Sequence, residues 1–282
     1  MPKDGSTLFG MTKPDIRLIC SDIDGTLLNK DRQLAEKTIA VFKALKERFP
    51  VVLISSRMPK SLRLLQSELK IETHPLIAYN GSLILDGNET LLSQELSLQQ
   101  MEKLVSYVEG TSIHLSLYHK DEWVVPAYDY WAKREENNTR VRPLIQELSL
   151  TLADWKKRGL GAHKIMCMGE ASEIEILYQK LRAEHAEEMH AYRSKDTYIE
   201  VSPIDQDKAA ALAHLLMKKY PEIEMEHCIA FGDNYNDSTL LEQAGIGVAV
   251  ANAKQEILEI ADVITERNTE DGVANYLEKI VV

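Results

Sequence analysis

The sequence predicts an α/β fold in which a parallel β-sheet, covered by helices on both faces, is interrupted by an inserted α+β unit. Three observations lead to this expectation. Fully apolar, β-branched runs alternate with helical patterns near both ends of the chain, as is typical of strands in a parallel sheet. Between these regions, residues 85–193 show hairpin patterns mixed with helices. The length of 282 residues fits one large domain or two of moderate size.

The first elements follow one another in a regular order. Residues 16–23 form an apolar run that changes abruptly to acidic residues. Apolar residues at three- and four-residue steps then predict a helix from Leu34 to Phe49, which Pro50 ends. Further along are a strand at 51–54, a helix around 62–69 and a strand at 75–79. This alternation of strands and helices predicts parallel pairing of the strands.

The middle of the chain departs from this order. A hairpin is expected over residues 82–92, and Ser97 with Gln100 forms a capping box for the helix that follows. The remaining elements expected here are strands at 113–118 and 123–125, a helix-compatible region at 128–158, a strand at 163–168, a helix capped by Ser172 and Glu175, and strands near 188–193 and 197–201.

The α/β order resumes in the last part of the chain. A helix is expected at 206–219, a strand at 228–231, a helix from about 236, a strand at 246–250 and then another helix. We therefore expect a core made of residues 14–84 and 194–282, with residues 85–193 as an inserted domain. Ligands of open α/β sheets bind at the carboxyl ends of the strands, so the insert is expected to act as a lid.

Composition narrows the classes of function. Lys and Arg number 33 against 44 Asp and Glu, and the formal net charge of −11 disfavours nucleic-acid binding but permits a small phosphorylated ligand. Three cysteines without CxxC spacing indicate neither a disulfide framework nor a zinc site. The apolar runs are shorter than the roughly 20 residues that span a bilayer, and the first 15 residues lack the apolar segment of a secretory signal. We expect a cytoplasmic protein with no membrane partner.

Two acidic motifs follow predicted strands. Asp22 and Asp24 leave the first strand near one another, and Gly25 permits a sharp turn. Asp233 and Asp237 follow another apolar strand at the start of a helix. Each motif alone has an ordinary alternative, which is a solvated Asp-Gly turn or acidic residues at a helix N-terminus. Together, at one edge of a sheet, four carboxylates need a divalent cation, and Mg²⁺ prefers such oxygen ligands.

These motifs resemble those of the haloacid dehalogenase-like phosphatases, in particular the Cof-type or sugar-phosphatase-like subfamily, which has a large α/β cap on a Rossmann-like core. The matching segments cover nearly the whole predicted core: DIDGTLL at 22–28, ISSR at 54–57, YNG at 79–81, EVSPIDQDK at 200–208, GDNYND at 232–237, AGIGVAVAN at 244–252 and EDGV at 270–273. Ser56 stands where the second motif usually has glycine, and Asp207 where the third usually has a small residue.

The resemblance implies a role for each motif residue. Asp22 is expected to be the nucleophile that forms an aspartyl-phosphate, and Asp24 the general acid and base. The residues expected to bind the phosphate are Ser55, Ser56 through its backbone amide, Lys208 and Asn236. Those expected to contact the rest of the substrate are Arg57 and Asn80. Those expected at Mg²⁺ are Asp22, Asp24 through its carbonyl, Asp233 and Asp237, the last of which could instead orient Lys208.

The resemblance also implies a substrate class, a small phosphorylated metabolite such as a sugar phosphate, because a large lid disfavours protein substrates. Polar and aromatic residues of the insert are candidates for substrate contact: His114, Tyr118, His119, Trp123 and His163. Two alternatives are a sugar phosphomutase of the same superfamily and a non-catalytic sensor that binds sugar phosphate. The sensor would be expected to lack Asp22, Asp24 or Lys208, and all three are present. The sequence indicates no oligomeric state.

Overall fold

The computed structural model describes residues 15–204 and 207–280, which divide into two compact units. The first unit comprises the described parts of Met1–Arg57, Leu62–Leu91 and Asp207–Val282, and the second those of Met58–Ser61 and Leu92–Gln206. The expectations for residues 1–14, for a helix start at 206 and for residues 281–282 lie outside the described residues. The predicted fold class, a parallel sheet between helices with a separate α+β unit, is confirmed.

The first unit is built on a sheet of eight described strands in the order β14-β13-β12-β1-β2-β3-β4-β5. Six of them run parallel: β1 (Leu18–Ser21), β2 (Val51–Ile54), β3 (Leu76–Ala78), β12 (Cys228–Gly232), β13 (Ile246–Val250) and β14 (Val263–Thr265). β4 (Leu83–Asp86) is antiparallel to β3, and β5 (Glu89–Ser93) lies at the edge. All residues of β1, β2 and β12 are buried, as expected for strands covered on both faces.

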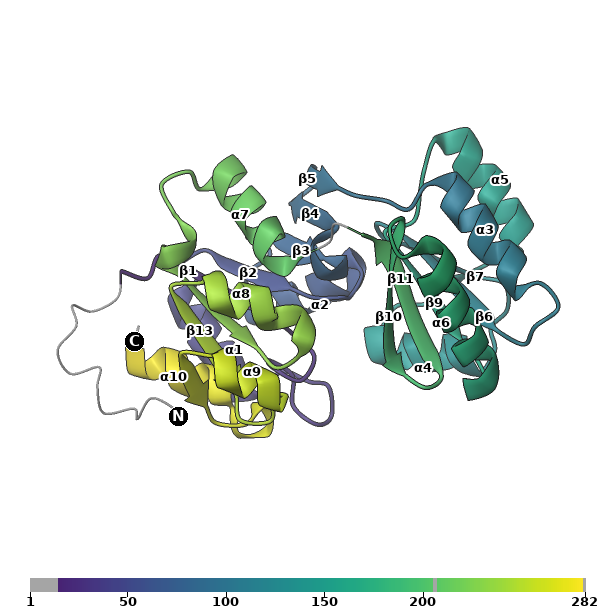
Figure 1. The fold of residues 1–282 in the computed structure, drawn as a ribbon. Coiled ribbons are helices and arrows are strands. Elements are labelled where there is room, and N and C mark those ends of the chain that lie inside the picture. Colours follow the sequence, from purple (N-terminus) through teal and green to yellow (C-terminus); the bar gives the residue numbers. More distant parts are fainter. Residues whose placement is uncertain (1–14, 205–206, 281–282) are drawn as a thin grey trace. The chain divides into compact units, whose positions relative to one another are not determined.

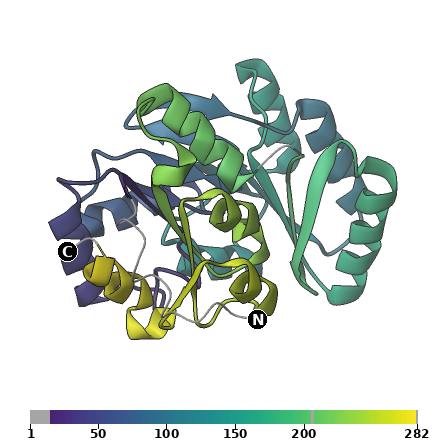
Figure 2. The same cartoon turned by 60° about the vertical axis from the view of Figure 1, so that its left-hand side comes forward.

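Helices form a layer on each face of this sheet (Figure 1 and Figure 2). On one face α1 (Glu36–Leu45) packs against α10 (Gly272–Ile280), and on the other α7 (Lys208–Lys219), α8 (Ser238–Gln243) and α9 (Gln255–Ile260) pack in sequence. α2 (Pro59–Leu69) connects β2 to β3. The observed helix is shorter than the predicted span from Leu34 to Phe49, since Leu34 is buried but precedes the helix and the chain forms a turn after Leu45. Short 3₁₀ turns lie at Tyr79–Gly81, Met225–His227, Tyr235–Asp237 and Asn268–Glu270.

The strand order changes direction between β1 and β12. From β1 the chain continues to β2 on one side, whereas β12, which pairs with β1 on its other side, continues to β13. Such a switch point leaves a crevice at the carboxyl ends of the two strands, where open α/β sheets bind their ligands. The residues that follow Ser21 and Gly232 therefore lie where a ligand-binding site is expected from the strand order.

The second unit has six described strands in the order β10-β11-β9-β6-β7-β8. Their bounds are β6 (His114–His119), β7 (Glu122–Val125), β8 (Leu144–Ile145), β9 (Lys164–Met168), β10 (Met189–Lys195) and β11 (Tyr198–Pro203). The helices of this unit are α3 (Leu98–Val108), α4 (Tyr130–Thr139), α5 (Leu148–Arg158) and α6 (Ala171–His185). An apolar core that includes Leu104, Leu115, Trp155, Ile165 and Leu177 joins α3, α5 and α6 to the sheet.

The structure tests two predicted helix caps in this unit. The capping box of Ser97 and Gln100 is present at the start of α3. The cap predicted at Ser172 and Glu175 is wrong, because the N-cap of α6 is Glu170, two residues before Ser172, and it makes no side-chain cap hydrogen bond. Glu175 instead forms an ion pair with Arg193 of β10, a long-range partner that the local pattern does not reveal. Among the described residues, none of the helices has the length and apolar character needed to cross a bilayer.

The three tryptophans of the chain, Trp123, Trp131 and Trp155, all lie in the second unit. Intrinsic fluorescence therefore reports the unfolding of this unit. We expect Leu104→Ala, a cavity in its core, to lower its free energy of unfolding by about 2–5 kcal/mol and to reduce the urea midpoint measured by fluorescence.

The matched control is Leu45→Ala, because Leu45 is equally buried but lies in α1 of the first unit. This variant is expected to leave the fluorescence midpoint near that of the wild type while it alters the far-ultraviolet circular dichroism transition. Equal shifts of the fluorescence midpoint in both variants would show that the two units unfold as one.

Candidate active site

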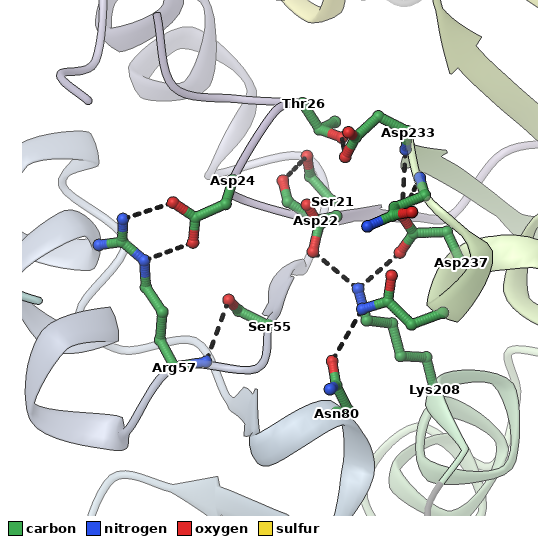
Figure 3. A network of polar contacts seen from close by, with 12 residues as sticks. Ser21, Asp22, Asp24, Thr26, Ser55, Arg57, Asn80, Lys208, Asp233 and Asp237 are labelled. Carbon is green, nitrogen blue, oxygen red and sulfur yellow. Dashed lines mark hydrogen bonds and ion pairs between the residues drawn. The ribbon is translucent and has the colours of Figure 1, made fainter. Parts of the chain in front are cut away.

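The two acidic motifs meet at the switch point between β1 and β12. Ser21 pairs with Phe231 in the parallel register, and the backbone N–H of Asp22 donates to the Phe231 carbonyl at 3.0 Å. The sheet thereby brings Asp22 next to the segment that carries Asp233, although the two residues are far apart in the sequence (Figure 3). The hydroxyl of Ser21 donates to the Asp22 carbonyl at 2.7 Å, which fixes the backbone where the strand ends.

Lys208 occupies the centre of this site. Its ammonium Nζ donates to Asp22 Oδ1 at 2.7 Å and to Asp237 Oδ1 at 2.5 Å, and the side chain is only 1% exposed (Figure 3). Burial by itself lowers the pKa of this ammonium, but the charges of Asp22 and Asp237 outweigh burial and raise it. Lys208 therefore stays positively charged. Its hydrogen bond goes to Asp22 Oδ1, and no hydrogen-bond donor among the described residues contacts Asp22 Oδ2.

Asp237 holds the loop after β12 in addition to its ion pair with Lys208. Its Oδ2 accepts hydrogen bonds from the backbone N–H groups of Asp233 at 3.0 Å and Asn234 at 3.1 Å. Both carboxylate oxygens of Asp237 are thus already occupied within the protein. Gly232 makes this arrangement possible, because a Cβ at that position would lie 2.5 Å from the Asp237 Cβ. These contacts agree with the expectation that Asp237 orients Lys208, and its expected role at the metal stays a prediction.

The carboxylates at this site carry more negative charge than Lys208 can balance. Asp22, Asp233 and Asp237 each offer an oxygen within 4.8 Å of the others. Burial, which Lys208 only partly opposes, raises the pKa of Asp22 well above its ordinary value. Burial and the nearby Asp237 raise the pKa of Asp233 to about 6. Such surplus charge on hard oxygen ligands fits a divalent cation such as Mg²⁺, so the residues present suit the predicted metal.

The loop after Asp22 is held by groups that the motif did not identify as functional. Gly25 has a φ of +88°, and a Cβ there would lie 2.4 Å from Asp233 Oδ2. Thr26 donates to Asp233 Oδ1 at 3.0 Å, and the Asn252 amide donates to the Gly25 carbonyl at 2.8 Å. Asn268 extends this support, since its amide donates to the Leu28 carbonyl and its backbone N–H donates to Asn252 Oδ1, both at 2.8 Å. No local pattern identifies Asn268, because its contacts exist only in the folded sheet.

Asp24 and Arg57, for which separate roles were expected, bind each other. The Arg57 guanidinium donates from Nε to Asp24 Oδ2 at 2.6 Å and from Nη2 to Asp24 Oδ1 at 2.7 Å (Figure 3). Such bidentate pairs hold a carboxylate in one orientation and favour its ionised form. Arg57 is buried, whereas 43% of the Asp24 side chain is exposed. The structure therefore leaves the Asp24 carboxylate outside the cluster of Asp22, Asp233 and Asp237.

The residues expected around the phosphate come from three segments of the first unit: Ser55 and Ser56 follow β2, Lys208 begins α7 and Asn236 follows β12. The Ser55 hydroxyl is buried after β2 and accepts from the Arg57 backbone N–H at 3.3 Å, and Ser56 is half-buried beside it. Asn80 adopts a left-handed conformation with φ 54°, and its side-chain oxygen accepts from the Asn236 amide at 3.0 Å. Asn80 and Asn236 thus lie together even though they were assigned to different parts of the substrate.

The five polar and aromatic candidates of the second unit are all buried: His114, Tyr118, His119, Trp123 and His163. Tyr118 stacks on Trp123 with ring centroids 5.6 Å apart, and His114 Nδ1 is 2.8 Å from Asp129 Oδ2. Two further histidines lie beside Glu95, with His119 Nδ1 at 3.6 Å and His163 Nε2 at 3.8 Å from its carboxylate oxygens, and His119 Nδ1 hydrogen-bonds with the Gly161 carbonyl at 2.9 Å. These contacts give each of the five side chains a packing role, and none of them identifies a substrate contact.

The fold and the carboxylate–lysine site define a hydrolase with a Rossmann-like core and an inserted α+β unit. The sequence profile of the haloacid dehalogenase-like hydrolases matches residues 19–277, and the chain belongs to this family. A Bacillus subtilis 5-amino-6-(5-phospho-D-ribitylamino)uracil phosphatase is 30% identical over 273 residues, covering 95% of this chain and 97% of that relative.

Two further proteins are similar over nearly their whole length. A protein of Haemophilus influenzae is 30% identical over 277 residues, covering 93% of this chain and 97% of that protein. The crystal structure of a haloacid dehalogenase-like hydrolase from Bacteroides thetaiotaomicron is 26% identical, with a TM-score of 0.87 over 94% of this chain and 99% of that one. The predicted family and the expectation of a phosphatase are confirmed.

Gly25 gives a test of the metal-binding loop. We expect Gly25→Ala to displace Asp233, because the new Cβ would lie 2.4 Å from Asp233 Oδ2, and to weaken Mg²⁺ binding about tenfold or more in calorimetric titrations. The control is Gly87→Ala, which has a φ of +57° but no atom within 4 Å of the new Cβ. It carries the backbone strain alone, so its Mg²⁺ affinity should equal that of the wild type.

The raised pKa of Asp233 gives a second test. The carboxyl must lose its proton to bind a cation, so Mg²⁺ affinity should be constant well above pH 6 and fall about tenfold per pH unit below it. In the metal-free protein, folding stability changes with pH in the opposite direction to the Mg²⁺ affinity. Its native state holds this proton more tightly than the unfolded chain, so it loses stability as pH rises from about 4 to about 6. Calorimetric titration and thermal unfolding from pH 4 to 8 measure both effects, and a Mg²⁺ affinity independent of pH would contradict the assignment.

Proposed function

We propose that the protein is a magnesium-dependent phosphatase that hydrolyses a small phosphorylated metabolite through a phosphorylated Asp22. The observation that supports this most directly is the Lys208 ammonium, which is buried between Asp22 and Asp237 with Asp233 beside them. A lysine held against the nucleophile can bind the phosphoryl oxygens as a compact point charge. The expected roles of Ser55, the Ser56 amide and Asn236 in phosphate binding belong to the same proposal.

The metal is proposed from the donor set. Asp22 and Asp233 would supply carboxylate oxygens and Asp24 its backbone carbonyl, while Asp237 orients Lys208 and the loop after β12. When bound, Mg²⁺ would neutralise the charge of the phosphate and of the carboxylates around it. The support from this structure is the cluster of three carboxylates around one ammonium; burial first, and the neighbouring carboxylates second, raise the pKa of both Asp22 and Asp233.

The chemistry would proceed in two steps on the protein's own groups. Asp22 attacks phosphorus with one carboxylate oxygen, and the bond to the leaving oxygen breaks as Asp24 gives that oxygen a proton. Asp24, now ionised, then takes a proton from water, whose oxygen attacks phosphorus and releases Asp22 and inorganic phosphate. Lys208 lies 2.7 Å from Asp22 Oδ1 and would balance the phosphoryl charge in both steps.

The Asp24–Arg57 pair adds a condition to this mechanism. Both oxygens of Asp24 accept hydrogen bonds from Arg57, and an acid held in that way is ionised and cannot donate a proton. At least one of these hydrogen bonds must therefore break, and Asp24 must take up a proton from solvent, before it can protonate the leaving group. An anionic substrate would compete for the guanidinium of Arg57 and thereby free Asp24, which agrees with the expected substrate contact of Arg57.

The proposed substrate is a sugar or polyol phosphate. The Bacillus subtilis relative is named for a substrate in which a phosphorylated ribityl chain is attached to a uracil ring, which is a polyol phosphate. Confinement of activity to a sugar phosphate, the role of the second unit as a lid and a cytoplasmic location all stay predictions. The phosphomutase alternative differs in its product, because a mutase returns the phosphoryl group to a sugar instead of to water.

The experiment is the release of inorganic phosphate from a panel of sugar and polyol phosphates, with Mg²⁺ or with a chelator. We expect turnover only with Mg²⁺, and we expect Asp22→Asn to lower kcat by about 10³-fold or more, because the amide cannot form the phosphorylated intermediate. Asp15→Asn is the control, because Asp15 is an exposed carboxylate that pairs with Arg17.

Retention of the wild-type rate by Asp22→Asn would falsify the proposal. Turnover that yields an isomeric sugar phosphate without free phosphate would identify a mutase instead. Full activity in the presence of the chelator would show that hydrolysis does not require Mg²⁺.

A further inference from the structure

Asp207, which departs from the usual third motif, lies where three segments of the first unit meet. It is the N-cap of α7, and its Oδ1 accepts from the Ala210 backbone N–H at 2.8 Å. Its Oδ2 accepts from the Thr239 hydroxyl at 2.6 Å, and Thr239 belongs to the first turn of α8. Its carbonyl oxygen packs against Gly81, where a Cβ would lie 2.6 Å away.

These contacts join the same two helices that the Lys208–Asp237 ion pair joins. Lys208 is the first residue of α7 and directly follows Asp207, and Thr239 is two residues after Asp237 at the start of α8. A side-chain hydrogen bond between Thr239 and Asp207 thus lies beside the buried ion pair and joins the same two helices. A single hydrogen bond between a hydroxyl and a carboxylate is among the stronger kinds in proteins.

Lys208 needs such a support because of its own flexibility. A lysine side chain has four rotatable bonds, and its ammonium here must reach two carboxylates, at 2.7 Å from Asp22 and 2.5 Å from Asp237. The position of Nζ therefore depends on where the first turn of α7 lies relative to α8. Displacement of a reacting group by about 1 Å can cost on the order of 10²-fold in rate.

We infer that Asp207 and Thr239 are positioning residues, which fix the start of α7 against α8 so that the Lys208 ammonium lies between Asp22 and Asp237. The inference rests on the proposed phosphatase function for its kinetic test. Neither residue contacts the reacting atoms. Asp207 acts through the backbone of Lys208, and Thr239 acts through Asp207.

The test compares Thr239→Val, which removes the hydroxyl at constant shape, with Thr239→Ser, which keeps it. We expect Thr239→Val to lower kcat/KM for phosphate-ester hydrolysis about tenfold and to raise the inhibition constant of inorganic phosphate about threefold or more. Thr239→Ser should stay within about twofold of the wild type in both values. The control is Thr151→Val in α5 of the second unit, which also removes a threonine hydroxyl hydrogen bond and should change thermal stability alone.

A thermal unfolding cycle tests the inference without reference to activity. If Thr239 acts through Lys208, the loss of Tm on Thr239→Val should be clearly smaller in a Lys208→Met background than in the wild type. If wild-type protein releases no phosphate from the panel, the proposed function fails and this cycle alone decides the inference. If the wild type is active, the inference is overturned when Thr239→Val matches Thr239→Ser in kinetics, or when the Tm losses of the cycle are additive.

Discussion

The buried ammonium of Lys208 is the interaction on which the rest of the site depends. A charge that is 1% exposed is costly unless it is paired, and here Asp22 and Asp237 both pair with it. The arrangement requires β1, β12 and the start of α7 to converge at one edge of the sheet. Because the three segments are distant in sequence, the site exists only when the parallel sheet is complete.

The balance between the Lys208 ammonium and the surrounding carboxylates also bears on the proposed chemistry. One ammonium lies among three carboxylates, and burial together with the neighbouring carboxylates raises the pKa of Asp22 and Asp233. In the proposed function, a divalent cation would balance this surplus of negative charge and allow a phosphate to bind. A chain with a net charge of −11 would then bind an anion at one place, because local charge would differ in sign from the total.

Many residues of the site fix the positions of the acidic side chains and of the loop after Asp22. Gly25 and Gly232 leave room for the side chains of Asp233 and Asp237, while Asn252 and Asn268 tie down the loop that follows Asp22. Asp24 differs from this pattern, since it is half-exposed and bound to Arg57. A fixed Asp22 beside a more exposed Asp24 suits the proposed mechanism, in which the acid must change partner between steps.

The sequence by itself determined the α/β order of strands and helices and the position of the acidic motifs after strands. These features follow from local periodicity and from the short range over which a strand gives way to a loop. Only the tertiary structure decided which side chains meet. The Asp24–Arg57 pair, the Asp207–Thr239 hydrogen bond and the support from Asn268 connect residues that no spacing rule relates. The cap predicted at Ser172 and Glu175 is absent as well, and Glu175 instead pairs with Arg193 of β10.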